Sequence, residues 1–247
     1  MPFAKDQYFM VNKAWVEKVV ELAELKPSDI ILEIGAGLGN LTQAMVSRVS
    51  LLYAFERDPR LAELLQRKFG REEKIKVLPY DALKYPWPSV TKIVANLPYS
   101  ISRDFVIKFF SSSIPYAFVV VQREFAKKLV AKVNTSNYRF VSAYTQSLGE
   151  VEFLLDIPSD AFEPKAPVAS TLIKIKHKYH SNNHVDKEKY RIFLLKLFSH
   201  RQKKIRNILP KGLTPPKFEH YRPPQLTTYE LLELYNHLRR TELLDIL

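Results

Sequence analysis

Residues 96–99 (Asn-Leu-Pro-Tyr) place an amide, a restricted backbone and an aromatic ring directly after an apolar run. Pro98 cannot donate to a sheet ladder and biases Leu97 toward an extended or turn conformation, so we expect a strand to end here. The Asn96 amide oxygen and the Leu97 carbonyl then become hydrogen-bond acceptors at the strand tip, beside the Tyr99 ring. Two acceptors and an aromatic ring suit a planar ring that carries an amino group.

Three of the six glycines, Gly35, Gly37 and Gly39, follow the apolar run Ile30–Ile34. Glycines at this place let the chain turn sharply and approach a ligand at the carboxyl end of a strand. Dinucleotide loops favour G-x-G-x-x-G and bring a pyrophosphate to a helix N-terminus. Here the spacing is G-x-G-x-G, and the carboxylate of Glu33 would repel a pyrophosphate but suits a sulfonium and an α-amino group. We therefore predict S-adenosylmethionine rather than NAD as the cofactor.

Two further acids follow the next two predicted strands. Glu56 lies about twenty residues after the glycines, where a carboxylate can accept both ribose hydroxyls. Asp81, followed by Ala82, is placed to accept from an adenine amino group. Because the carboxyl ends of neighbouring parallel strands meet at one edge of a sheet, we expect Glu33, Glu56 and Asp81 to lie around one cofactor.

Asn96 then lies beside a methyl donor. The amino nitrogen of adenine is a poor nucleophile because its lone pair is delocalised into the ring. Acceptors at Asn96 and Leu97 favour a pyramidal nitrogen, and Tyr99 can stack on a flipped base, a contact worth about 1–3 kcal/mol. No metal and no strong base are required. Methylation at pyrimidine C5 would need a cysteine nucleophile, and the chain has no cysteine.

The elements that must position these residues alternate between short apolar runs and amphipathic segments. This alternation predicts an α/β fold with a doubly wound, mostly parallel seven-stranded sheet. No helix separates the last two strands, so we expect an antiparallel hairpin at one edge. The predicted strands are Ile30–Ile34, Leu51–Phe55, Ile75–Leu78, Lys92–Ala95, Tyr116–Val121, Val151–Leu155 and Thr171–Ile175. The predicted helices are Asn12–Leu25, Leu41–Val49, Arg60–Phe69, Arg103–Phe110, Asp186–Leu209, for which a central break is considered, and Thr228–Arg239.

The net charge of +12 is concentrated in one block. Twelve lysines and arginines but only two acids lie between Lys174 and Lys211, a pattern typical of a polyanion binder. Residues 177–185 are polar and turn-prone, and prolines separate the helices that follow. We predict a catalytic domain over residues 1–178, a linker over 179–185, and a small basic helical domain that binds RNA over 186–247.

Composition excludes several other classes of protein. No apolar run approaches the ~18 residues of a membrane-spanning helix, and the N-terminus has no secretory signal pattern. The absence of cysteine excludes thiolate metal sites and favours an intracellular, cytoplasmic protein. The six histidines form no convincing metal set, so we expect no metal. We also expect a monomer.

The chain resembles the ribosomal RNA adenine N6,N6-dimethyltransferase family, whose members have the Rossmann-like class I methyltransferase fold and use S-adenosylmethionine. The resemblance rests on ILEIGAGLGNLT (31–42), FERD (55–58), YDALKY (80–85) and NLPYSIS (96–102). It implies that the first three segments bind the cofactor, with Asn96 also in contact with it. The fourth is similar to the catalytic loop of the family, which comprises Asn96, Leu97, Pro98 and Tyr99 here.

Two outer segments extend the resemblance. DQYFMVN (6–12) is similar to a family segment that implies cofactor contacts for Gln7, Tyr8 and Met10, although Asp6 and Tyr8 depart from the usual residues. The segment AFEPKAPVAS (161–170) implies that Phe162 is a second aromatic against the target base.

The C-terminal third distinguishes the subfamilies. FLLKLFSHRQKKIRNIL (193–209) resembles a segment of the enzymes that modify small-subunit rRNA. The implied substrate is two adjacent adenosines in the 3′-terminal hairpin loop, within small-subunit rRNA or a precursor of the small ribosomal subunit, with a role in its biogenesis. Four basic residues would contact the phosphate backbone: Arg201, Lys203, Lys204 and Arg206.

Two alternatives stay open at this stage. The chain could be a ribosome-assembly or nucleic-acid-binding relative that kept the fold without the chemistry. It could also belong to the relatives that methylate large-subunit rRNA and confer macrolide resistance, although these have a different C-terminal domain.

Overall fold

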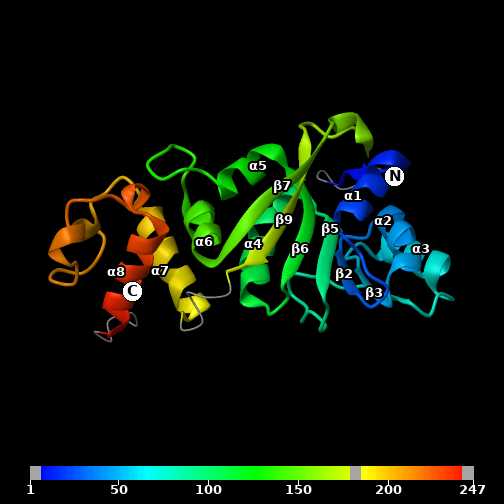
Figure 1. The fold of residues 1–247 in the computed structure, drawn as a ribbon, viewed down its shortest axis with the longest axis horizontal. Coiled ribbons are helices and arrows are strands. Elements are labelled where there is room, and N and C mark those ends of the chain that lie inside the picture. The colour runs from blue at the N-terminus through cyan, green and yellow to red at the C-terminus, as the bar shows by residue number, and fades with distance from the viewer. Residues whose placement is uncertain (1–6, 179–184, 241–247) are drawn as a thin grey trace. The chain divides into compact units, whose positions relative to one another are not determined.

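The computed structural model describes residues 7–178 and 185–240. The described chain forms two compact units: residues up to Ala126 with Val151–Lys176, and Lys127–Glu150 with the residues from His177 onward. Residues 127–150 thus group with the C-terminal part, whereas the sequence analysis placed them in the catalytic domain over residues 1–178. That functional division stays a prediction, and residues 179–184 of its linker lie outside the described residues. Figure 1 gives the element labels used below.

The first unit is built on a seven-stranded, mostly parallel sheet with strand order β4-β3-β2-β5-β6-β9-β7. The neighbours from β4 to β6 pair in parallel, and β9 pairs antiparallel with β6 next to the edge strand β7. This confirms the predicted α/β class and the change of direction at one edge. The strands are β2 (Ile30–Ile34), β3 (Leu51–Phe55), β4 (Ile75–Leu78), β5 (Lys92–Asn96), β6 (Tyr116–Gln122), β7 (Gly149–Ile157) and β9 (Ser170–His177).

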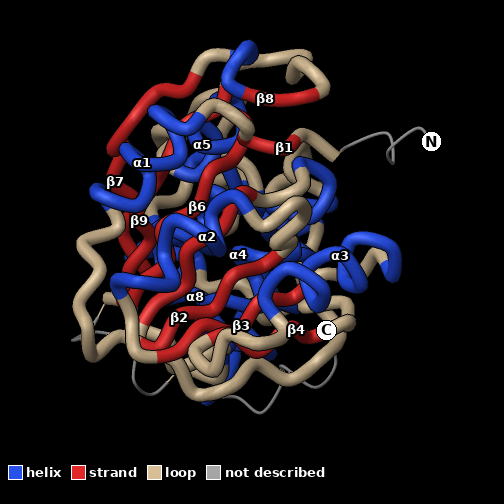
Figure 2. The backbone as a smooth tube through the Cα atoms, turned by 90° about the vertical axis from the view of Figure 1, so that its right-hand side faces the viewer, coloured by secondary structure: helices blue, strands red, loops and turns tan. Residues whose placement is uncertain are grey.

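The central strands are apolar because helices leave them little contact with water. The interior of β6 is fully buried, as expected for a parallel strand covered on both faces. In Figure 2, α2 and α3 lie in front of the parallel strands. The helices of this unit are α1 (Lys13–Leu22), α2 (Asn40–Met45), α3 (Pro59–Phe69), α4 (Ser102–Ser111) and α5 (Arg123–Leu129), the last of which runs into the second unit.

Local sequence explains where α3 begins. The Asp58 carboxylate accepts from the main-chain N–H of Arg60, and Pro59 occupies the first turn. Asp58 is therefore a helix cap.

A two-stranded sheet joins distant parts of the chain near the tip of β5. Strand β1 (Phe9–Met10) pairs antiparallel with β8 (Phe162–Glu163). The amide of Asn40 also donates to the Met10 carbonyl at 2.9 Å. These contacts fix the N-terminal segment next to the glycine loop and the Asn-Leu-Pro-Tyr segment.

The second unit packs three helices around tyrosines and phenylalanines: α6 (Phe140–Leu148), α7 (Lys187–Ser199) and α8 (Thr228–Arg240). The Tyr190 hydroxyl lies 2.8 Å from Ser147 Oγ, and its ring meets the Tyr235 ring edge-on at 5.0 Å. Buried hydroxyls with partners stabilise such a core. No helix within the described ranges is long and apolar enough to cross a membrane.

The helix predicted over Asp186–Leu209 is interrupted near its centre, as considered from the sequence, because α7 ends at Ser199. The short strands β1 and β8 and the helices α5 and α6 were not predicted. His200 leaves the helical region at φ −115° and ψ 33°, and a turn leads to a short 3₁₀ helix at Ile205–Asn207. Contacts distant in sequence, from Arg201 to the Ser136 carbonyl and from Ile205 to the Tyr221 carbonyl, hold the segment after α7, so helical periodicity could not give the residue at which the helix ends. Helices α5 and α6 had no clear amphipathic pattern, because α5 is one to two turns long and α6 is buried almost all round.

Candidate active site

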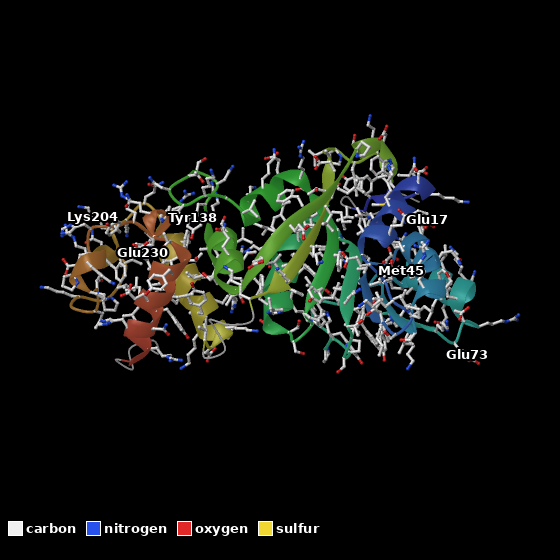
Figure 3. All side chains as sticks on the ribbon, in the orientation of Figure 1. Glu17, Met45, Glu73, Tyr138, Lys204 and Glu230 are labelled. Atoms are coloured by element: carbon white, nitrogen blue, oxygen red, sulfur yellow. The ribbon has the colours of Figure 1, made fainter. Side chains whose placement is uncertain are left out.

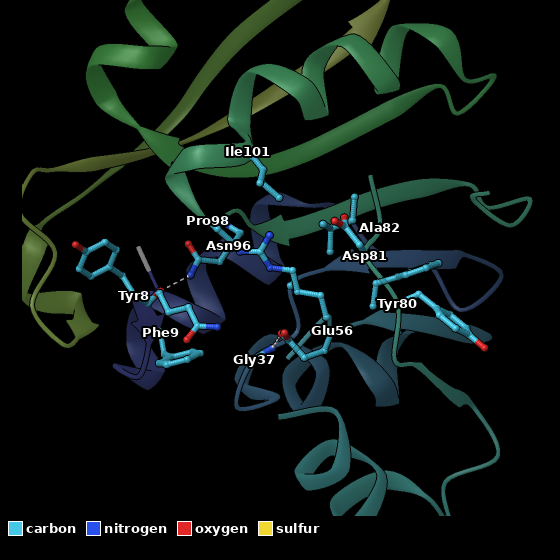
Figure 4. A pocket seen from close by; sticks show the side chains of 15 residues that line it. Tyr8, Phe9, Gly37, Glu56, Tyr80, Asp81, Ala82, Asn96, Pro98 and Ile101 are labelled. Carbon is cyan, nitrogen blue, oxygen red and sulfur yellow. Dashed lines mark hydrogen bonds between the residues drawn. The ribbon is translucent and has the colours of Figure 1, made fainter. Parts of the chain in front are cut away.

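A pocket opens at the carboxyl ends of β2, β3, β4 and β5, four neighbouring parallel strands. Its empty volume, open mouth included, is about 660 Å³. Figure 4 shows the side chains of this pocket. The lining residues are Gln7, Tyr8, Phe9, Ile34, Gly35, Gly37, Phe55, Glu56, Arg57, Tyr80, Asp81, Ala82, Asn96, Pro98 and Ile101.

The glycine loop forms the floor of this pocket. Gly37 has φ +56°, a conformation that side chains disfavour, and a Cβ there would lie 2.7 Å from the Phe9 ring. Its main-chain N–H donates to Glu56 Oε2 at 2.9 Å. Only glycine therefore lets the loop pass between the Phe9 ring and the end of β3.

Glu56 connects two loops through its carboxylate. Besides the bond from Gly37, Oε1 accepts from the Asp58 N–H at 2.8 Å. The residue is only 5% exposed, and burial raises its pKa. Each carboxylate oxygen has two lone-pair directions, so capacity remains for the vicinal hydroxyls of a ribose.

Asp81 begins a tightly held loop. Its Oδ1 accepts from the Leu83 N–H at 2.9 Å. The ammonium of Lys108, on α4, donates to the carbonyls of Ala82, Leu83 and Tyr85 at 2.8, 3.0 and 2.6 Å. This lysine therefore organises the loop at the Asp81 end of the pocket without lining the pocket itself.

Glu33 lies deeper than the sequence suggested. It is a β2 residue, 1% exposed, and Thr42 Oγ1 donates to its Oε2 at 2.6 Å. Burial, with a smaller contribution from the nearby Glu56 charge, raises its pKa to about 8. It lines a smaller adjoining hollow together with Met10 and Asn96.

Asn96 ends β5 at the wall of the pocket. Its Nδ2 donates to the Tyr8 carbonyl at 2.9 Å, a bond drawn in Figure 4. The Leu97 N–H donates to the Val120 carbonyl on β6, which fixes the backbone of the loop. With the amide nitrogen engaged, Oδ1 and the Leu97 carbonyl are the acceptor atoms of this segment.

Tyr99 follows the proline in a short 3₁₀ turn. Its hydroxyl lies 2.7 Å from Ser170 Oγ, and its ring stacks on Tyr8 with centroids 5.2 Å apart and planes at 29°. Burial raises the pKa of the Tyr99 hydroxyl, which keeps it protonated at neutral pH. An aromatic face next to Asn96 is the arrangement needed to hold a planar base.

Comparison with known proteins agrees with this geometry. Residues 4–228 match the family described as ribosomal RNA adenine dimethylase. A "Probable ribosomal RNA small subunit methyltransferase A" of Methanococcoides burtonii is 33% identical over 247 residues, 94% of this chain and 92% of that protein. Another of that name, from Pyrococcus abyssi, is 36% identical over 204 residues, 82% of this chain and 73% of that protein. The chain belongs to the ribosomal RNA adenine dimethylase family.

Solved structures show the same fold. A dimethyladenosine transferase from Plasmodium falciparum superposes with a TM-score of 0.81 at 22% identity, covering 94% of this chain and 98% of that one. The 23S rRNA methyltransferase ErmE superposes with a TM-score of 0.70 at 24% identity, covering 94% and 99%. The chain therefore has the Rossmann-like class I methyltransferase fold of this family.

The pocket brings together most of the residues that the sequence assigned to the cofactor of this dimethylase. Met10 and Glu33 lie in the adjoining hollow instead, and Gly39 begins α2 at a left-handed φ of +77°. Phe162 is 4% exposed in the core and does not line the pocket. Pro98, assigned to the catalytic loop, lines the pocket as well. The residues assigned to the cofactor that line it are Gln7, Tyr8, Gly35, Gly37, Glu56, Asp81, Ala82 and Asn96.

Sequence reasoning missed six lining residues. Five are direct neighbours of predicted residues along the chain, so their position beside those residues was the available signal. Of these five, Phe9 enters through the N-terminal sheet; the sixth residue, Ile101, enters through the 3₁₀ turn before α4. The six are Phe9, Ile34, Phe55, Arg57, Tyr80 and Ile101.

The four residues predicted to bind RNA lie in the second unit, in the turn after α7. Lys203 and Arg206 are exposed, whereas Arg201 and Lys204 are half-buried. Arg201 Nη1 donates to the Ser136 carbonyl at 3.3 Å. Its guanidinium is therefore partly committed to the protein itself.

Proposed function

We propose that this chain transfers methyl groups from S-adenosylmethionine to N6 of two adjacent adenosines in the 3′-terminal hairpin loop of small-subunit rRNA. The observation that carries the proposal is the orientation of Asn96. Its nitrogen is held by the Tyr8 carbonyl, which leaves the amide oxygen for an amino group on the substrate.

The pocket fits S-adenosylmethionine in the chemistry of its donor set. Glu56 offers acceptors for a ribose, and Asp81 one for an adenine amino group. The buried carboxyl of Glu33 lines the adjoining hollow, where the positive sulfonium and α-amino groups of a bound cofactor would favour its ionised form, which a phosphate would disfavour. When bound, the cofactor supplies an electrophilic methyl group on a sulfonium.

The residues of the chain act on the base. Asn96 Oδ1 and the Leu97 carbonyl accept the two N–H bonds of the adenine amino group, which localises its lone pair on nitrogen. Tyr99 stacks on the ring and fixes its plane. The proton of the methylated nitrogen leaves to water, so no side chain has to act as a strong base.

The choice of substrate is supported by the curated relatives, whose names specify the small subunit. The binding partner on this view is small-subunit rRNA, free or in a precursor particle. A hairpin loop suits the chemistry because its unpaired bases can be splayed into the pocket.

The test is label transfer from S-adenosylmethionine to ribosomal subunits isolated from cells that lack this modification. The proposal predicts label in the small subunit only. Label in the large subunit would instead mean that the chain methylates large-subunit rRNA. RNA binding without label would mean that the chain assists ribosome assembly without catalysis.

A further inference from the structure

Three segments of the second unit are hydrogen-bonded to one another in a closed triangle. The loop at 127–139 accepts from Arg201 through the Ser136 carbonyl. The same loop donates from the Asn134 N–H to the Pro224 carbonyl at 2.7 Å. The triangle closes where the Ile205 N–H donates to the Tyr221 carbonyl at 2.8 Å. Segments 127–139, 200–212 and 220–225 therefore form one continuous surface, here called the three-segment surface.

This surface is strongly basic. Its segments contain no aspartate or glutamate. The second unit as a whole holds eighteen lysines and arginines but eight acids, whereas the first holds twenty and eighteen. Figure 3 labels Tyr138 and Lys204, which belong to two of the segments. The exposed basic residues are Lys127, Lys128, Lys132, Arg139, Lys203, Arg206, Lys211 and Arg222.

The first of the segments is anchored to α6 at its base. Gln146 Nε2 donates to the carbonyls of Leu129 and Ala131, both at 2.9 Å. The Tyr138 ring is fully buried against Phe198 on α7, with centroids 5.9 Å apart. The exposed lysine and arginine side chains of this loop are therefore attached to a backbone that is held in place.

An exposed aromatic ring lies among these charges. Tyr221 is 44% exposed and directly precedes Arg222. Its carbonyl bond to Ile205 places it beside the segment of Arg206. Basic side chains combined with an exposed ring favour single-stranded nucleic acid, since each base offers a face for stacking.

We propose that the three-segment surface binds unpaired segments of the substrate rRNA, through its lysines and arginines on phosphates and through Tyr221 stacked on a base. The inference rests on the proposed function for the identity of the RNA. It adds residues 127–139 and Tyr221 to the contact region predicted from the sequence. It also assigns Arg201 a positioning role, because that side chain ties two of the segments together.

The charge test compares Lys132→Gln/Arg139→Gln with a control that removes two positive charges elsewhere. The control Lys26→Gln/Lys74→Gln alters exposed residues at the amino ends of β2 and β4. Affinity for a small-subunit 3′-hairpin RNA is measured from about 50 to about 200 mM salt. The surface variant should bind more weakly, with a salt slope lower by about two, and the control should keep the wild-type slope. Equal slopes in both variants would overturn the proposal.

The stacking test compares Tyr221→Ala with Tyr221→Phe. The alanine variant should lose about 5- to 100-fold in affinity at an unchanged salt slope, and phenylalanine should restore it. Wild-type affinity in Tyr221→Ala would remove the stacking role. Binding to acidic phospholipid vesicles is measured as well. If the Lys132→Gln/Arg139→Gln variant lost vesicle binding but bound RNA with wild-type affinity, the surface would be assigned to membranes instead. S-adenosylmethionine titration and label transfer, run in parallel, separate a failure of this surface from a failure of the proposed function.

Discussion

The side-chain nitrogen of Asn96 donates to the main-chain carbonyl of Tyr8 at 2.9 Å, across 88 residues of sequence. The bond fixes which end of the amide faces the pocket. Strand β1, which follows Tyr8, is itself held by β8 and by Asn40. The acceptor that we assign to the substrate is therefore oriented by the N-terminal segment before any substrate arrives.

Replacing Asn96 by alanine should lower kcat for methyl transfer by about 10²- to 10³-fold, as for the loss of one catalytic hydrogen-bonding group. Cofactor and RNA affinities should stay near those of the wild-type, because the amide contributes to the reacting geometry more than to binding. Single-turnover assays with calorimetric titrations separate these quantities. A wild-type rate in this variant would disprove the role of the amide.

Glu56→Ala should weaken S-adenosylmethionine binding by at least about tenfold. The change removes the proposed ribose acceptor and leaves the buried N–H of Gly37 without its partner, at about 1–3 kcal/mol, and it also removes the acceptor of the part-buried Asp58 N–H. Isothermal titration calorimetry measures the effect. Glu63→Ala, an exposed acid on α3, is the control and should bind as the wild-type does.

Ser170 should position Tyr99 through their 2.7 Å hydroxyl contact. Ser170→Ala is expected to lower kcat/KM for RNA by about 2- to 10-fold, the net value of one hydrogen bond. In a Tyr99→Phe background the same serine change should cost nothing further, because the hydroxyl partner is already gone. Additive losses in this double-mutant cycle would show that Ser170 acts through some other contact.

The buried Glu33 should make stability depend on pH. Its native pKa of about 8 exceeds the unfolded value of 4.5, so between these values the native state holds a proton that the unfolded state has released. The free energy of unfolding should therefore fall as pH rises from about 5 to about 8. Below that window Glu33 contributes nothing, and above it the penalty is constant.

The isosteric variant Glu33→Gln removes this titration and still offers an oxygen to Thr42. Urea unfolding at several pH values should show that the wild-type loses stability relative to Glu33→Gln across the window. A difference that does not change with pH would mean that Glu33 is ionised in the native protein throughout.

Strand boundaries followed closely from sequence because short aliphatic runs bounded by turns carry a local signal. β2, β3 and β4 begin and end as predicted. The other four strands are longer than predicted: β5 and β6 extend by one residue at their carboxyl ends, and β7 and β9 extend by one or two residues at both ends. The pocket residues at strand ends could be predicted for the same reason. Strand order places Gly35, Glu56, Asp81 and Asn96 around one opening.

Long-range contacts could not be read from local pattern. Nothing near Tyr8 in the sequence indicates that its ring stacks on Tyr99, or that its carbonyl holds Asn96. The grouping of residues 127–150 with the C-terminal part depends likewise on buried partners such as Tyr138 and Phe198. Glu33 lines the hollow beside the pocket, and nothing in the sequence indicates that Thr42 donates to its carboxylate.

The most direct test of the account maps methylation at nucleotide resolution on small subunits treated with the wild-type chain and, separately, with Asn96→Ala. We predict N6,N6-dimethyladenosine at two adjacent adenosines of the 3′-terminal hairpin loop with the wild-type, and neither with the variant under matched conditions. Modification at another site, or equal modification by the variant, would contradict the account.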